Sequence, residues 1–277
     1  MNVGYVQTEP RFGERASNFD AVRALVEGGP KLRPIDLLVL PELFTTGYVF
    51  TSREEAVSLS EPAEGPTAKF LRDIARMTGG VVVGGFAEAD GRKIYNSSLI
   101  VDADRILGTY RKIHLYDREK LWFEPGDRPP ALYRAGGAAF GVMICFDWYF
   151  PETMRLLMLL GAQVAAHPAN LVLPYCQDAM KTRCLENRMF AVTANRIGRE
   201  LRGASELYFT GASQITAVDG SVLSVAPAKE GYVDVVTIDP AAANLKQINE
   251  NNDLRLDRRV ELYAALLEGA KKEREGA

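Results

Sequence analysis

The sequence has few cysteines, no excess of charge of either sign and no long hydrophobic run, and each absence narrows what the protein can be. The three cysteines, Cys145, Cys176 and Cys184, are too few for a disulfide scaffold and favour a reducing, cytoplasmic compartment. A net charge of −3 predicts no basic surface for nucleic acid or anionic lipid. No apolar run approaches the ~20 residues of a membrane span, and MNVGYVQTEP lacks the pattern of a signal peptide, so we expect neither.

The composition is that of a globular protein with a sizeable core. Hydrophobic residues make up 47% of the 277-residue chain and charged residues 25%. The chain contains no linker, low-complexity stretch or repeat of fixed period. Residues 1–277 are therefore predicted to form a single domain.

Short apolar runs alternate with helical patterns along the chain. Strands are predicted at residues 3–7, 37–40, 81–86, 141–144, 164–166, 191–194 and 232–238, and helices at 18–27, 67–77, 151–160, 178–188 and 256–272. Two pairs of runs, 95–102 with 105–110 and 212–218 with 221–225, predict hairpins. The alternation indicates an α/β layered fold, and the hairpins indicate mixed sheets.

The stretch GVMICFDWYFPE places Cys145 at the end of an apolar run, where a cysteine is either a packed side chain or a nucleophile. A free thiol has a pKa of about 8.5 and needs help to form the reactive thiolate. Histidine is the usual helper, and the chain has two, His114 and His167. A Cys–His peptidase or thioesterase is therefore one alternative, although a structural hydrogen bond is expected for His167 in AAHPANL.

Two other strand ends carry charged residues. Glu42 follows a buried apolar run in LLVLPELFTTGY, where burial would raise the pKa of its carboxyl and suit it to act as a general base. Lys112 follows a strand-like stretch in TYRKIHL and is either an oxyanion partner or a solvated charge. Because sheet folds gather strand ends into one site, the three residue types together favour catalysis more than any one alone.

These three segments, in this order, resemble the catalytic segments of the nitrilase superfamily, the carbon–nitrogen hydrolases. The spacing agrees as well, with 70 residues from Glu42 to Lys112 and 33 from Lys112 to Cys145. The resemblance runs from Val3 to about Tyr263 and includes YNSSLI, FEPGD, HPANLVLP and RCLENR. It is strongest to the small microbial hypothetical nitrilases and amidases.

The resemblance implies an αββα sandwich, in which two mixed β-sheets are flanked by helices. It also implies a Glu–Lys–Cys triad of Glu42, Lys112 and Cys145. In this triad Glu42 is the general base and Cys145 attacks the amide or nitrile carbon. Lys112, with the backbone N–H of Phe146, stabilises the oxyanion.

Many members of the superfamily carry a second glutamate between the lysine and the cysteine. DREKLWFEPGD offers two candidates, Glu119 and Glu124. Glu119 has the better spacing to the aromatic pair and the Pro-Gly that follow, and it is expected to position the substrate and polarise the leaving group. Glu124 is expected to be a surface charge.

The residues after Cys145 bear on the substrate. Related ω-amidases and N-carbamoyl amino acid hydrolases have an arginine where this chain has Tyr149, which offers no charged fork for a carboxylate. Nitrilases usually have a glutamate where Asp147 stands. A small uncharged amide is therefore favoured, with nitriles and N-carbamoyl amines as alternatives. The expected substrate-binding residues are Tyr48, Phe146, Trp148, Tyr149 and Asn170, with packing or a strand-end hydrogen bond as the alternative role.

The superfamily uses no metal or cofactor, so none is expected, and Cys176 and Cys184 are interpreted as ordinary small residues. Its members usually dimerise through the helices flanking the nucleophile strand, which predicts a homodimer or higher homo-oligomer. A C-terminal extension from about residue 245 is expected to contact a partner subunit. A non-catalytic binding protein is disfavoured, because all three triad residues are present.

Overall fold

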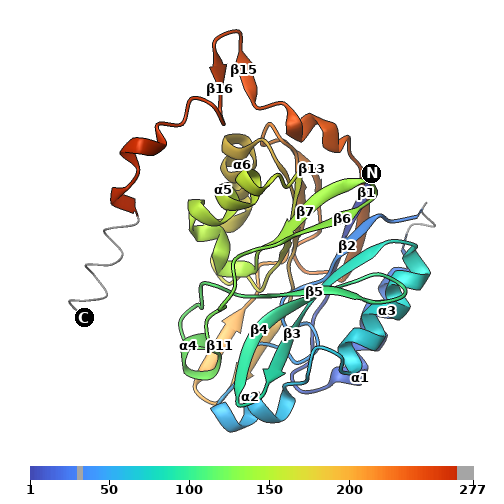
Figure 1. The fold of residues 1–277 in the computed structure, drawn as a ribbon. Helices are drawn as coiled ribbons and strands as arrows, with labels where there is room; N and C mark the ends of the chain where they lie inside the picture. Colours follow the sequence, from blue (N-terminus) through green and yellow to red (C-terminus); the bar gives the residue numbers. More distant parts are fainter. Residues whose placement is uncertain (30–33, 267–277) are drawn as a thin grey trace. The chain divides into compact units, whose positions relative to one another are not determined.

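A computed structural model of the chain describes residues 1–29 and 34–266 (Figure 1). The chain divides into two compact units, Met1–Asn244 and the residues from Leu245 onward. The first unit contains two six-stranded sheets, each with helices on its outer face (Figure 1). The predicted αββα sandwich of two mixed sheets is therefore confirmed.

The first sheet has the strand order β14-β1-β2-β3-β4-β5. Its strands are β1 (Asn2–Gln7), β2 (Leu37–Val39), β3 (Val81–Asp90), β4 (Lys93–Val101), β5 (Ile106–Arg111) and β14 (Tyr232–Thr237). The β1–β2 and β2–β3 pairs are parallel, whereas the other three are antiparallel. Helices α1 (Arg15–Gly28) and α3 (Pro66–Thr78) cover its outer face.

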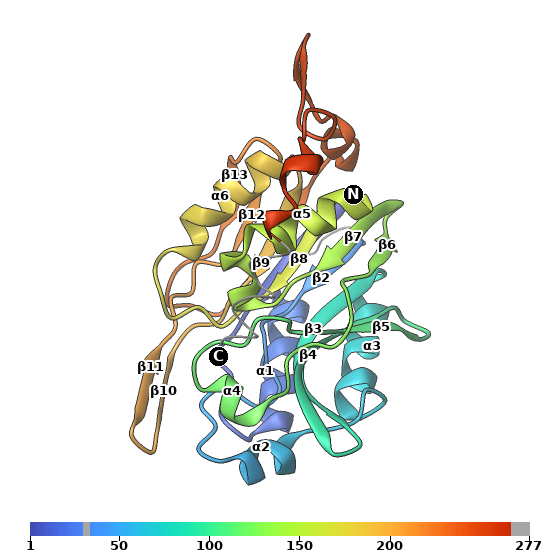
Figure 2. The same ribbon diagram turned by 60° about the vertical axis from the view of Figure 1, so that its left-hand side comes forward.

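The second sheet has the strand order β13-β12-β9-β8-β7-β6. Its strands are β6 (Leu132–Ala135), β7 (Ala138–Val142), β8 (Val164–Pro168), β9 (Phe190–Ala194), β12 (Gln214–Thr216) and β13 (Val222–Val225). The β7–β8 and β8–β9 pairs are parallel, and helices α5 (Pro151–Leu160) and α6 (Cys176–Asn187) cover the outer face. A separate hairpin of β10 (Arg199–Arg202) and β11 (Ser205–Tyr208) extends away from both sheets (Figure 2).

Burial on both faces of the first sheet explains its unbroken apolar runs. On β2, Leu37 and Val39 join the hydrophobic cluster shared with the second sheet, while Leu38 joins the cluster under α1 and α3. Successive side chains of a strand point to opposite faces, so a strand covered on both sides needs apolar residues throughout. A residue that follows such a strand is itself buried, as Glu42 is.

Most predicted elements are present within a few residues of their predicted bounds. Helix α5 spans Pro151–Leu160 as predicted, and β4 and β5 form the predicted hairpin. The strand predicted at 141–144 ends earlier, because β7 stops at Val142 and a 3-10 turn begins at Cys145. Helices α2 (Arg53–Leu59) and α4 (Glu119–Trp122) and the β10–β11 hairpin were not predicted.

The helix predicted over residues 256–272 is wrong for the residues that the structure describes up to Tyr263. These form turns and the short 3-10 helix Val260–Leu262, and residues from 267 onward lie outside the description. Asp253 accepts hydrogen bonds from the backbone N–H groups of Arg255 and Leu256, a local pairing that competes with a helix. The same unit contains the short strands β15 (Gln247–Asn249) and β16 (Asn252–Asp253). Across the described ranges, none of the helices combines the length and apolar character that crossing a membrane requires.

Candidate active site

Glu42, Lys112 and Glu119 meet in a buried charge cluster at the ends of first-sheet strands. Glu42 follows β2, Lys112 follows β5 directly, and Glu119 opens α4. The Lys112 ammonium Nζ lies 2.7 Å from Oε1 of Glu42 and 2.7 Å from Oε1 of Glu119, and all three side chains are buried. Gly85 on β3 packs against the Glu42 backbone, where an added Cβ would lie 2.5 Å from the Glu42 Cα. The position of Glu42 therefore depends on a glycine of the next strand along the chain.

Two neutral side chains complete the cluster. Asn96 on β4 donates from Nδ2 to Oε1 of Glu42 at 2.6 Å and to Oε2 of Glu119 at 3.4 Å. The Tyr48 hydroxyl donates to Oε1 of Glu119, and its ring packs edge-on against Phe209. Asn96 has no role predicted from the sequence. The available signal was the polar triplet in YNSSLI, which interrupts an otherwise apolar strand.

The protonation of the cluster follows from burial and opposing charges. Burial alone would lower the pKa of Lys112, but the carboxylates of Glu119 and Glu42 outweigh it and raise the pKa. Burial raises the pKa of Glu119 to about 7, and the Lys112 ammonium limits that rise. Oε2 of Glu42 is buried and has no hydrogen-bond partner among the described residues. That oxygen is therefore available to accept a proton.

Cys145 begins a 3-10 turn, Cys145–Tyr149, three residues after β7 ends at Val142. Its backbone is left-handed, with φ of 41°, a conformation that costs a non-glycine residue about 1–2 kcal/mol. His167 on β8 helps to hold it, because Nε2 of His167 lies 3.0 Å from the backbone carbonyl oxygen of Cys145. The turn is thus constrained from the side of the second sheet.

The Cys145 thiol keeps its proton in the resting site. Burial raises the pKa of this thiol well above its usual value, and the Glu42 carboxylate raises it further. The Lys112 ammonium and a hydrogen bond from the backbone of Asn170 act in the opposite direction. Because the raising effects prevail, attack by the sulfur needs a base beside it.

Asp147 ties the nucleophile turn to the segment that carries Lys112. Its buried Oδ2 accepts hydrogen bonds from the backbone N–H of Ile144 at 2.9 Å and from the Tyr110 hydroxyl at 2.7 Å. Its Oδ1 accepts from the backbone N–H of His114 at 3.0 Å and lies 2.8 Å from Nδ1 of the same residue. Tyr110 and His114 flank Lys112, so one carboxylate fixes the two segments relative to each other.

Neither histidine is placed to activate the thiol. His167 uses Nε2 for the Cys145 carbonyl and Nδ1 for the Thr193 hydroxyl at 3.0 Å, and burial lowers the pKa of His167 to about 4. A carbonyl only accepts, so Nε2 carries the proton and Nδ1 accepts from Thr193. The ring of His114 stacks on Phe150 with centroids 3.7 Å apart. The structural hydrogen bond predicted for His167 is confirmed, and the geometry gives no support to a Cys–His pair.

A small cleft opens beside the thiol. Its cavity volume is about 30 Å³, and it is lined by Tyr116, Cys145, Phe146, Trp148, Tyr149, Asn170, Leu171, Val172 and Leu173. Tyr149 is 52% exposed, whereas Trp148 is 8% exposed and packs into the core. Neither Oδ1 nor Nδ2 of the buried Asn170 has a hydrogen-bond partner among the described residues. Four of the five predicted substrate-binding residues line this cleft, and Tyr48 instead contacts Glu119.

The remaining candidates lie outside the charge cluster. Glu124 is partly exposed and lies 3.9 Å from Arg53, as a surface charge would. Cys176 and Cys184 are buried on α6. Within residues 1–29 and 34–266, no group of three or more His, Cys, Asp or Glu side chains is arranged to hold a metal ion.

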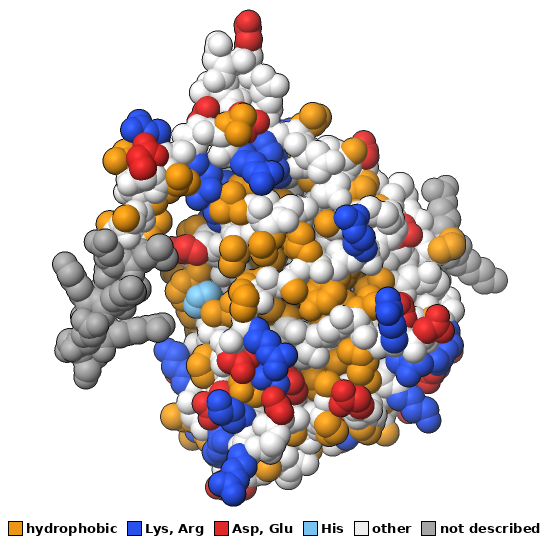
Figure 3. Space-filling view, viewed as in Figure 1, with side chains coloured by type: hydrophobic (Ala, Val, Ile, Leu, Met, Phe, Trp, Pro, Cys, Tyr) orange, Lys and Arg blue, Asp and Glu red, His pale blue; other side chains and the backbone are white. Residues whose placement is uncertain are grey.

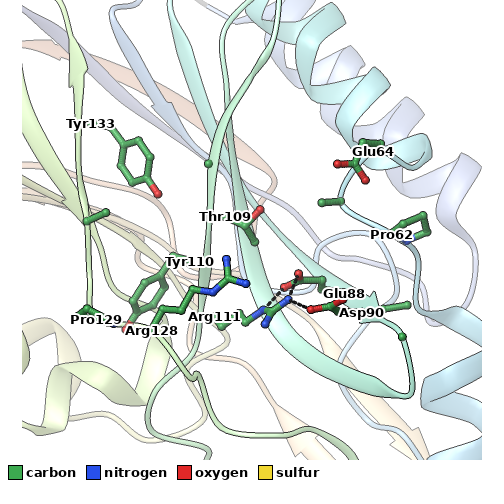
Figure 4. A pocket seen from close by; sticks show the side chains of 15 residues that line it. Pro62, Glu64, Glu88, Asp90, Thr109, Tyr110, Arg111, Arg128, Pro129 and Tyr133 are labelled. Carbon is green, nitrogen blue, oxygen red and sulfur yellow. Dashed lines mark hydrogen bonds and ion pairs between the residues drawn. The ribbon is translucent and has the colours of Figure 1, made fainter.

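A larger hollow, of about 700 Å³, lies beside β5 and contains Arg111. There Arg111 contacts Glu88 at 2.6 Å and Asp90 at 2.7 Å (Figure 4). Asp127 lies 3.1 Å from the same guanidinium. These charges are satisfied by one another, in contrast with the unpartnered oxygen of Glu42 and the protonated thiol of Cys145.

Comparison with known proteins adds to this geometry. Residues 2–247 match the family model described as carbon-nitrogen hydrolase. A nitrilase from Pyrococcus abyssi is 47% identical over 264 residues, which cover 95% of this chain and 99% of that protein. An (R)-stereoselective amidase from Pseudomonas sp. is 35% identical, with 95% of this chain and 93% of that one covered. The structure is also similar to a solved mutant of the amidase from Nesterenkonia sp. AN1, which shows the result of Michael addition of acrylamide at the active-site cysteine. The TM-score is 0.76 at 26% sequence identity, and the match covers 96% of this chain and 99% of that chain.

Proposed function

The chain belongs to the carbon–nitrogen hydrolase family and is an amidase-type hydrolase of the nitrilase superfamily, and on that basis we propose that it hydrolyses a small uncharged amide through a thioester on Cys145. The observation that carries the proposal is the buried cluster of Glu42, Lys112 and Glu119, whose charges act on the thiol that lines the cleft. The products are a carboxylic acid and ammonia.

The proposed reaction begins with the protonated thiol. Oε2 of Glu42 takes the proton as the Cys145 sulfur forms a bond to the amide carbon. The tetrahedral intermediate then collapses, the C–N bond breaks with its electron pair on nitrogen, and nitrogen takes the proton from Glu42 and leaves as ammonia. Water next attacks the thioester while Glu42 accepts its proton. Collapse releases the carboxylic acid, and the proton returns to sulfur.

The remaining groups of the cluster stabilise charge and orient the amide. The Lys112 ammonium and the backbone N–H of Phe146 face the oxyanion that forms in each half of the reaction. Glu119 holds the other side of Lys112 and binds the leaving nitrogen. Asn96 and Tyr48 donate hydrogen bonds to the two carboxylates, and these bonds keep both in place while the proton moves.

The cleft favours a small neutral acyl group. Its walls are mainly aromatic and aliphatic, and no lysine or arginine is among its lining residues. A carboxylate in the acyl group would therefore lack a cationic partner. A cleft of about 30 Å³ holds little more than a water molecule, so exposed side chains at its mouth must move before an amide enters.

Ammonia release from a panel of amides, nitriles and N-carbamoyl amines tests the proposal. We expect turnover of small primary amides by the wild-type protein, complete loss with Cys145→Ala and retention with Cys184→Ala, which removes a buried thiol on α6. Mass spectrometry of a quenched reaction should find the acyl group on Cys145. Turnover that survives Cys145→Ala would exclude the thioester.

Nitrile and N-carbamoyl hydrolysis use the same residues and remain the alternative activities within this family. The relative named nitrilase is the specific observation in their favour. The same panel separates them, because faster ammonia release from nitriles than from the matching amides would replace the amide proposal.

We also propose that the protein forms a homodimer or higher homo-oligomer. Helices α5 and α6 expose Leu156, Leu160 and Leu185, and hydrophobic side chains gather in a band across the face drawn in Figure 3. Exposed apolar surface of this kind marks interaction sites. Light scattering after size exclusion should give a multiple of the chain mass, and Leu156→Glu with Leu160→Glu should reduce it. A wild-type monomer would contradict this.

A reducing, cytoplasmic location is proposed from the cysteines. All three are free thiols in the structure, and disulfides are the usual state of paired cysteines in oxidising compartments. Cell fractionation with an antibody to the native protein tests the location, and recovery in an oxidising compartment would contradict it.

A further inference from the structure

We propose that the side-chain amide of Asn170 recognises a second neutral carboxamide or ureido group on the acyl part of the substrate. The inference rests on the proposed amide hydrolysis and narrows its substrate class. Asn170 is 2% exposed, lines the cleft beside Cys145, and leaves both Oδ1 and Nδ2 without a partner among the described residues.

Other buried amides near the site are bonded at one or both ends of the side chain. Asn195 accepts from the Leu171 backbone at 2.9 Å and donates to Gly211 and Thr210. Asn96 donates to two carboxylates. A buried polar group without a partner costs about 1–3 kcal/mol, so the unpaired amide of Asn170 needs an explanation outside the packing of the chain.

The position of Asn170 is fixed by the backbone around it. The residue before it donates its N–H to the Ala194 carbonyl at 2.8 Å, and the residue after it, Leu171, is held by the Asn195 side chain. The backbone of Asn170 lies close enough to the Cys145 thiol to oppose the rise in its pKa, and both residues line the same cleft. The side-chain amide therefore belongs to a rigid wall next to the reacting sulfur, within reach of a substituent close to the scissile carbonyl.

The hydrogen-bonding needs of the unpartnered Asn170 amide indicate which chemical group it binds. Oδ1 needs a donor and Nδ2 needs an acceptor, and a planar carboxamide or ureido group supplies both at once. A carboxylate supplies acceptors only and would face Oδ1 without a proton between them. A hydrocarbon group would leave the Asn170 amide buried and unpaired in the complex as well. The neutral diamide class therefore fits the cleft better than either.

Two substrates of nearly equal shape test the inference. Malonamide carries a second carboxamide where 3-methylbutanamide carries an isopropyl group. The wild-type protein should show a kcat/KM for malonamide about 10- to 30-fold above that for 3-methylbutanamide, the effect of two hydrogen bonds in a buried site. Asn170→Leu, which keeps the side-chain shape, should bring the ratio to one or below. Thr8→Val, which removes a buried hydroxyl that lies away from the cleft and has no hydrogen-bond partner among the described residues, should leave the ratio unchanged.

Thermal unfolding separates recognition from a structural role. Because Asn170→Leu removes two unpartnered polar atoms from a buried site, its unfolding midpoint should equal or exceed that of the wild type. A lower midpoint together with an unchanged substrate ratio would assign Asn170 a structural role and overturn the inference. Equal hydrolysis of both amides by the wild type would overturn the inference alone, whereas hydrolysis of no amide in the panel would overturn the proposed function with it.

Discussion

The two sheets supply halves of the site with opposite chemistry. From the first sheet and the short helix α4 that follows it come Glu42, Lys112 and Glu119, three charged groups that are buried, with Lys112 bonded to both carboxylates. From the second come Cys145 and Asn170, which are uncharged and whose reactive atoms have few partners. The charged groups of the first half bond to one another, whereas the side-chain amide of Asn170 in the second half has no hydrogen-bond partner among the described residues.

This difference separates the tasks of reactivity and recognition. Buried charges are costly unless they are paired, so the first half is held together by mutual attraction and tolerates little change. The second half depends on shape and hydrogen bonds, so its changes other than those at Cys145 itself should act on substrate choice. Asp147 crosses the division, because it is a buried carboxylate in the second half that binds the segment carrying Lys112.

Removing the central cation should have the largest effect. Lys112→Met leaves two carboxylates buried without their partner, and we expect kcat/KM to fall by at least about 1,000-fold and the free energy of unfolding by about 3–5 kcal/mol. Adding Glu42→Gln and Glu119→Gln to Lys112→Met should restore most of the stability without activity. Chemical denaturation and ammonia release measure the two effects. Unchanged stability in Lys112→Met would show that the pairing is unimportant.

Asp147→Asn should weaken the connection between the halves. Its new NH₂ group cannot accept from the Ile144 N–H or the Tyr110 hydroxyl, so we expect kcat to fall by about 100-fold with KM changed less than about threefold. Alkylation of Cys145 by iodoacetamide should slow as well. Tyr110→Phe removes a single hydrogen bond and provides the matched control, with a smaller loss. A change confined to KM would argue against a positioning role.

The buried histidine should make stability depend on pH. Burial lowers the pKa of His167 to about 4, so between the unfolded value of 6.5 and 4 the unfolded chain binds a proton that the folded chain does not. The contribution is fully present above pH 6.5 and is lost as the pH falls through 4, by up to about 3 kcal/mol. Denaturation at several pH values should show a shallower decline for His167→Gln. Identical slopes would refute this assignment.

The rim of the open half should be the most tolerant part of the site. Tyr149 is 52% exposed and contacts the rings of Phe146 and Trp148. Tyr149→Ala should therefore change kcat/KM for small amides by less than about threefold, with its effect in KM rather than kcat. Steady-state kinetics with a short and a longer amide measure this. A fall in kcat as large as that expected for Asp147→Asn would contradict the view that the exposed rim of the cleft tolerates substitution.

Local sequence patterns predict the charged residues Glu42 and Lys112 better than they predict Asn96, the residue that hydrogen-bonds the carboxylates. Glu42 and Lys112 each follow an apolar run, a local pattern that locates a strand end. Asn96 lies inside a strand, and its contacts depend on the pairing that sets it opposite Ala87 of β3 and brings its side chain to both carboxylates. Register of that kind is set by tertiary packing rather than by local sequence.

The same limit applies to Asp147 and to α4. In sequence, Asp147 is a variant of a family position, whereas its hydrogen bonds come from residues 33 and 37 positions away as well as from the adjacent turn. Helix α4 spans four residues, too few to show a helical period, yet it carries Glu119. Elements held by distant contacts could not be predicted from local patterns.

The packing of Gly85 has a consequence for mutational data. A methyl group at this position would overlap the Glu42 backbone, so even Gly85→Ala should displace the proposed base without altering any reactive side chain. A saturation scan of activity would score position 85 alongside Glu42 itself. The positions identified by loss of function in such a scan would therefore include Gly85, which has no side chain to take part in the reaction. It matters because a larger residue there would collide with the Glu42 backbone.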